Sequence, residues 1–113
     1  MENTQNITEA VNGFVAKNQE VFDAHAQEQL PRLWADGNTT KLEWAMAKKY
    51  IKVWTCRQGR RESIHAFIDA TTGDVYMPAG LNKPAKHSRG NVFSDRNGAE
   101  SFNPQNGYIN YLR

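Results

Sequence analysis

The chain has 113 residues and a net charge of +2, and its 39% apolar and 23% charged residues predict a single folded domain over residues 1–113 with one modest core. No apolar run is long enough to cross a membrane and the N-terminus lacks a signal-peptide pattern, which predicts a cytoplasmic protein without membrane contact. The only cysteine, Cys56, excludes an internal disulfide and a cysteine-rich zinc site.

The N-terminal part carries the strongest helical pattern. Apolar side chains recur every three or four residues from Ile7 to Leu30, which predicts an amphipathic helix. Asn6 can cap this helix, Glu9 stands in the capping-box position, and Pro31 ends it. We expect its apolar stripe to pack against the rest of the fold.

The capping pattern recurs at Thr40 and Glu43 and predicts a second helix up to about Ala47, so that residues 1–47 form a helical part. From Lys48 onward the pattern alternates with period two, which predicts antiparallel strands at residues 50–57, 63–70 and 75–77. Residues 80–107 are rich in glycine, asparagine and proline and predict a long functional loop, and residues 108–112 are a candidate last strand.

These elements predict an α+β fold. The N-terminal helix and the second helix would pack on one face of a small antiparallel sheet of about three or four strands, which residues 48–113 form. A long irregular C-terminal segment would follow the sheet. Whether this segment covers the free face of the sheet is left open by the sequence.

The pairing of the first two strands decides which side chains face the helix. A four-residue loop at 58–61 would pair Val53 with Ala66 and Trp54 with His65. The face toward the helix would then be apolar. The opposite face would carry Tyr50, Lys52, Trp54, His65, Phe67 and Tyr76.

This second face has the chemistry of a base-stacking surface, because aromatic rings stack on bases and neighbouring cations meet phosphates. The predicted stacking residues are Trp54, Phe67, Tyr76, His65 and Tyr50, with Lys52 as a phosphate contact. The alternative is a second core layer, since large exposed aromatic patches are uncommon.

Positive charge is concentrated in the C-terminal part. Residues 1–47 hold seven acidic and three basic residues, and residues 48–113 hold five acidic and eleven basic ones. The predicted phosphate-binding residues outside the aromatic face are Lys83, Lys86, His87 and Arg89 in one basic segment, and Arg57, Arg60 and Arg61 at the first hairpin. An ordinary solvated basic surface is the alternative.

No catalytic motif, metal-ligand spacing or cofactor fingerprint is recognisable, so we expect neither a metal nor a cofactor. One enzymatic alternative is a metal-independent ribonuclease. His65 or His87 would act as general acid or base, supported by Lys86, Arg89 and Tyr76.

From Met46 onward the chain resembles small, uncharacterised proteins of tailed bacteriophages. The resemblance is carried by segments at 46–53, 66–69, 72–76 and 83–91 and by the ending Tyr111-Leu112-Arg113. It covers roughly the last 68 residues and implies a phage or prophage product acting in a bacterial cytoplasm. No catalytic residue follows from it, and the first 45 residues would be a helical extension, an oligomerisation arm or a docking arm.

The leading hypothesis is a non-enzymatic protein that binds single-stranded nucleic acid or a nucleotide-like anion through the aromatic face and the basic segment. A second hypothesis is a phage accessory protein that binds and inhibits a host protein, with tryptophan and tyrosine as anchors. The oligomeric state stays open, a homo-oligomer included.

Overall fold

The computed structural model of the chain describes residues 6–80 and 83–110. Helix α1, Ile7–Gln29, begins where the sequence predicts, because the side chain of Asn6 accepts a 2.9 Å hydrogen bond from the backbone N–H of Glu9. A short helix α2, Pro31–Ala35, follows after Leu30. Among the described residues, neither helix combines the length and the hydropathy needed to cross a membrane.

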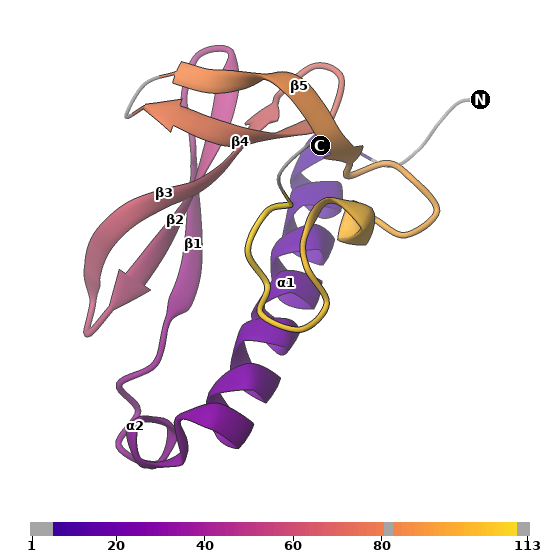
Figure 1. Cartoon of the computed structure of the whole chain (residues 1–113). Helices are drawn as coiled ribbons and strands as arrows, with labels where there is room; N and C mark the ends of the chain where they lie inside the picture. Colours follow the sequence, from indigo (N-terminus) through magenta and orange to yellow (C-terminus); the bar gives the residue numbers. More distant parts are fainter. Residues whose placement is uncertain (1–5, 81–82, 111–113) are drawn as a thin grey trace.

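Five antiparallel strands form one sheet in which each strand pairs with the next along the chain (Figure 1). They are β1 (Lys41–Met46), β2 (Tyr50–Arg57), β3 (Arg60–Asp69), β4 (Asp74–Gly80) and β5 (Lys83–Asn91). A 3₁₀ helix, η1 (Ala99–Ser101), lies in the segment that follows.

The predicted second helix is therefore wrong, because residues 41–46 form strand β1. Trp44 lies opposite Val53 of β2, and Leu42 and Trp44 pack against the core while Glu43 is exposed. This alternation has period two, and the pairing with β2 satisfies the backbone groups that a helix would have bonded internally. The helical part of the chain thus ends near residue 35 rather than at 47.

The predicted long irregular segment at 80–107, and with it the sheet of three or four strands, is also wrong. Residues 83–91 form β5 at the edge of the sheet, paired with β4. An edge strand tolerates lysine and proline, which protect the edge but hide the alternation that marks buried strands. The expected last strand is reduced to one bridge between Phe102 and Ile109, and residues 111–112 lie outside the described part.

The hairpin between β2 and β3 is tighter than predicted. Gln58 and Gly59, with φ of 54° and 78°, form a two-residue turn in place of the four-residue loop. In the half of the hairpin away from the turn, Val53 pairs with Ala66 as expected. Irregularities on either side of Trp54 and Thr55 then shift the register by one residue twice, so Trp54 lies opposite Ile64 and not opposite His65.

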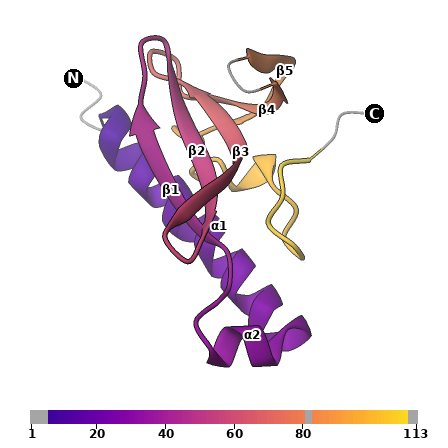
Figure 2. The ribbon, with the colours of Figure 1, turned by 90° about the vertical axis from the view of Figure 1, so that its left-hand side faces the viewer.

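The core lies between α1 and one face of the sheet. Ile51, Val53, Ala66, Ile68 and Val75 pack there against Ala10, Val11 and Phe14 of α1. The C-terminal segment adds Val92, Phe102 and Ile109 to the same core, so it lies on the helix side of the sheet. Figure 2 shows β1–β3 in front of α1, and no described helix or loop lies over this front face.

Candidate functional site

The face of the sheet turned away from α1 carries most of the aromatic residues predicted to bind a ligand. Because neighbouring side chains in a strand alternate, the positions between the core residues point to this side. They include Tyr50, Lys52 and Trp54 of β2, Phe67 of β3 and Tyr76 of β4. These five residues define the outer face.

Positively charged groups lie over the rings of the outer face. The guanidinium of Arg61 is 5.0 Å from the centre of the Trp54 ring, and the ammonium of Lys52 is 5.9 Å from that of Phe67. The ammonium of Lys49 lies 5.3 Å from the Tyr50 ring. Such cation–π contacts are worth about 0.5–1 kcal/mol at exposed sites and keep the cations close to the rings.

The rings differ in how far a ligand could reach them. Tyr50, Trp54 and Tyr76 are half-buried, whereas Phe67 is only 1% exposed. Tyr50 packs edge-on against Phe67 and Tyr76, with ring centres 5.8 Å and 6.2 Å apart. Phe67 therefore packs beneath the half-buried rings of the two tyrosines, and its predicted role as a stacking surface is wrong.

Glu43 on β1 lies beside Trp54 and ties two groups of this face together. Its carboxylate accepts a 3.0 Å hydrogen bond from Nε of Arg61 and a 3.5 Å one from the thiol of Cys56. The bond from Arg61, followed by that from Cys56, lowers the pKa of Glu43. Burial, followed by the hydrogen bond to Glu43, raises the pKa of Cys56, so its thiol is a poor nucleophile at neutral pH.

His65 does not belong to the outer face, and this part of the prediction is wrong. Its ring is buried on the helix side, 5.5 Å from the ring of Phe22, and its Nε2 lies 2.7 Å from Oδ1 of Asn18. Burial lowers the pKa of His65 from 6.5 to about 4, so its imidazole is neutral at pH 7. The shifted register next to Trp54 turns this side chain inward.

The predicted basic residues have different surroundings. Arg89 is half-buried, and its guanidinium donates hydrogen bonds to the backbone carbonyls of Asn110 and His87, so it holds the C-terminal segment against β5. Lys83, Lys86 and His87 are exposed on β5. Arg60 is exposed at the β2–β3 turn, and Arg57 there lies 4.0 Å from the carboxylate of Glu62.

Of the two histidines of the ribonuclease alternative, His65 is separated from the other predicted groups, because it is buried on the helix side. His87 lies on β5 next to Ser88, which pairs with Tyr76 of β4, and the guanidinium of Arg89 donates to the carbonyl of His87. The ribonuclease alternative with His87 therefore stays a prediction. Within the described residues, no three His, Cys, Asp or Glu side chains are grouped so that they could hold a metal ion.

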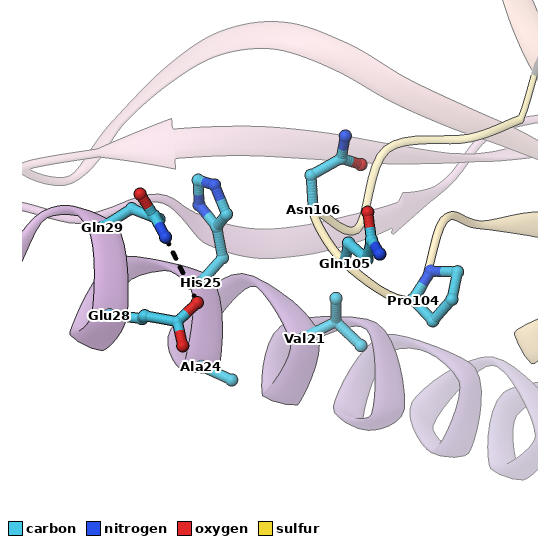
Figure 3. Close-up of a pocket in the computed structure, with 8 residues that line it drawn as sticks. All are labelled: Val21, Ala24, His25, Glu28, Gln29, Pro104, Gln105 and Asn106. Atoms are coloured by element: carbon cyan, nitrogen blue, oxygen red, sulfur yellow. Dashed lines mark hydrogen bonds between the residues drawn. The ribbon is translucent and has the colours of Figure 1, made fainter.

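A pocket of about 520 Å³ lies between the C-terminal half of α1 and residues 104–106 (Figure 3). Its only carboxylate, from Glu28, accepts a hydrogen bond from the neighbouring Gln29. His25 points into the same space, and the other lining residues are Val21, Ala24, Pro104, Gln105 and Asn106. None of the residues predicted to bind a ligand lines this pocket.

Sequence reasoning missed Lys49 and Asn18. Lys49 directly precedes the first predicted strand. Its positive charge and its place next to Tyr50 in the sequence could have indicated a cation beside that ring. Asn18 is fully buried and interrupts the apolar stripe of α1 midway between Phe14 and Phe22. A polar residue at such a position signals a buried hydrogen-bonding partner, which the sequence does not identify.

Comparison with known proteins places the sequence in a family but gives it no characterised relative. No curated protein and no solved structure matches the chain significantly. The sequence model of a family of unknown function, DUF7717, matches residues 1–112. The match includes α1, so the shared sequence is not confined to the last 68 residues as the phage resemblance implied. The chain belongs to the family of unknown function DUF7717.

Proposed function

We propose that this protein binds single-stranded nucleic acid through its outer face and catalyses no reaction. The observation that carries the proposal is the alternation of rings and cations on a sheet face that no other described element covers. Stacking contributes about 1–3 kcal/mol per base and tolerates any base, while cations beside the rings meet the phosphates.

Each group has a distinct role in this proposal. Trp54, Tyr50 and Tyr76 stack on successive bases, and Phe67 holds the two tyrosines in place from below. Lys49, Lys52 and Arg61 meet phosphates, Arg61 after exchanging its contact with Glu43 for one with the ligand. Further along the strand, phosphates would meet the exposed cationic side chains of Lys83, Lys86, Arg57 and Arg60 and the side chain of His87.

A strand of several nucleotides suits this surface better than a single nucleotide does. One nucleotide would occupy one ring and its neighbouring cation, whereas the outer face offers three partly exposed rings, two of them, Tyr50 and Trp54, with a cation over the ring. Binding energy from successive bases adds along the strand. The resemblance to tailed-phage proteins supports a role in the cytoplasm of a bacterium, where a phage or prophage would supply such strands.

The proposal is tested by titrating the protein into fluorescein-labelled oligothymidine and oligouridine and measuring anisotropy over a salt series. We expect the protein to bind both oligonucleotides. The logarithm of the association constant should fall linearly with the logarithm of the salt concentration, with a slope of about −0.7 for each phosphate contact. Trp54→Ala should weaken binding by about tenfold or more, the equivalent of one lost stacking contact. A clear preference for either oligonucleotide would identify DNA or RNA as the ligand.

Trp34 provides the matched control. It lies on α2 with the ammonium of Lys41 5.5 Å from its ring, so Trp34→Ala removes the same kind of ring–cation pair away from the outer face. The Trp34→Ala variant should bind the oligonucleotides with the same affinity as the unchanged protein. The proposal would be overturned if the protein did not bind the oligonucleotides at low salt, or if Trp54→Ala and Trp34→Ala lowered the affinity equally. So would a stoichiometric protein partner that survives nuclease treatment and is lost with Trp54→Ala.

A further inference from the structure

A pocket of about 300 Å³ opens on the helix side of the sheet, away from the outer face. Its walls come from the ends of β2, β3 and β4 and from the C-terminal segment. The lining residues are Thr55, Ser63, Ile64, His65, Met77, Pro78, Tyr108 and Ile109. This volume is at the lower end of the range for small-molecule sites, which are mostly apolar with a few placed polar groups.

The hydrogen bonds of Asn18 determine the tautomer of His65 in this pocket. The side-chain amide of Asn18 donates to the carbonyl of Gly107 at 2.8 Å, so its Oδ1 faces the histidine and can only accept. Nε2 of His65 therefore carries the proton of the 2.7 Å contact with Oδ1. Nδ1 is left as a lone-pair acceptor.

Nδ1 has no hydrogen-bond partner among the described residues, although His65 is only 5% exposed. Thr39 Oγ1 is the one fully buried side-chain oxygen or nitrogen of the described residues that lacks a partner, so Nδ1 of His65 is reached from the pocket. This nitrogen is therefore a free acceptor for a molecule in the pocket that donates a hydrogen bond. Beside it, the hydroxyl groups of Thr55 and Ser63 lie 2.7 Å apart and share one hydrogen bond.

The pocket selects against charged molecules. Its lining side chains include no acid, lysine or arginine, and burial keeps the imidazole of His65 neutral at pH 7. An ion would lose its hydration there without gaining an opposite charge. The ring of Tyr108 and the thioether of Met77 instead suit a flat apolar surface.

We propose that this pocket binds a small, uncharged aromatic molecule that donates one N–H or O–H hydrogen bond to Nδ1 of His65. A volume of about 300 Å³ has room for an occupant the size of a nucleobase with a short substituent. The site is separate from the outer face, since His65 contacts Phe22 and Asn18 of α1 and the rings of the proposed nucleic-acid surface point to the other side of the sheet.

Indole, a flat apolar ring with a single N–H, is the test probe, and 1-methylindole, which lacks the donor, is its matched control. Nitrogen-15 NMR of the full-length protein should show millimolar indole shifting the signals of Ser63, Ile64, Tyr108 and Nδ1 of His65. The methylated probe should bind about five- to tenfold more weakly, as expected for one neutral hydrogen bond. Equal affinities, shifts elsewhere on the protein, or no shifts at all would overturn the proposal.

Variants at exposed positions test the location without disturbing the core. Ser63→Trp puts a large side chain at the rim and should abolish indole binding, whereas Glu62→Trp, next to the pocket but outside it, should not. Trp54→Ala should leave indole binding unchanged, which separates this proposal from that for the outer face. If the Ser63→Trp variant still binds indole, the probe binds elsewhere on the protein and the proposal for this pocket is wrong.

Discussion

Asn18 and His65 form a buried hydrogen-bonded pair of side chains. Together with a second hydrogen bond of Asn18, this pair links α1, the sheet and the C-terminal segment. Asn18 is on α1, His65 on β3, and the carbonyl that Asn18 also bonds belongs to Gly107. Gly107 has a φ of 85°, and a Cβ at this position would come within 3.1 Å of the Phe22 ring and 3.2 Å of the Asn18 amide. The close contact therefore needs glycine.

The burial of His65 makes the stability of the protein depend on pH. The pKa of the folded state, about 4, is below the unfolded value of 6.5, so the unfolded chain binds more protons between these values. The free energy of unfolding therefore falls as pH drops through this window, and we expect it to be about 2 kcal/mol smaller at pH 5 than at pH 7. Urea denaturation followed by tryptophan fluorescence at both pH values measures the difference.

His65→Gln is the control, because it removes the titrating ring and keeps an amide that can bond Asn18. Most of the difference between the two pH values should disappear in this variant. If the variant keeps the full difference, other groups cause the pH dependence and the assignment to His65 is wrong.

At the scale of elements, α1 is joined to the C-terminal segment through Gly13 and Asn97. The amide of Asn97 donates to the carbonyls of Ala10, at 3.0 Å, and Val92, at 2.7 Å. A Cβ on Gly13 would lie only 2.2 Å from Oδ1 of Asn97. Glycine inside the helix thus lowers helix propensity but allows the segment to dock.

Gly13→Ala should destabilise the protein by about 1–3 kcal/mol, the usual cost of overpacking, although alanine would stabilise an isolated helix by about 1 kcal/mol. Chemical denaturation measures the change. In a background that already carries Asn97→Gly, which removes the obstructing side chain and suits the φ of 55° at that position, Gly13→Ala should cost less than it does alone. A stabilised single variant would show that the close contact is absent in solution.

At the scale of the whole molecule, the C-terminal segment decides which face of the sheet is open. Phe102 packs edge-on against Phe14 of α1 with ring centres 5.7 Å apart and is 4% exposed. The backbone N–H of Asn110 donates to the carbonyl of Ser101, which keeps Ile109 on the same side. Because the segment completes the core on the helix side, the outer face stays uncovered by the described residues.

Phe102→Ala should therefore lower the free energy of unfolding by about 3–5 kcal/mol, as for other buried phenylalanines. Met46→Ala removes a large apolar side chain that is 52% exposed, and it should change stability by no more than about 0.5 kcal/mol. Thermal and urea denaturation of both variants give the comparison. Similar small effects in the two variants would contradict the docking of the segment.

Local patterns were sufficient for α1, for its cap at Asn6 and for the outward direction of Trp54, because the periods of 3.6 and 2 depend only on neighbouring residues. They were insufficient for β1, where a capping pattern at Thr40 and Glu43 competed with pairing to a strand that the sequence does not position. They also failed for His65, which an irregular register moved to the core side, and for β5, whose polar residues suit an edge. Strand pairing joins residues distant in sequence, so only the tertiary structure could decide which face each of these side chains occupies.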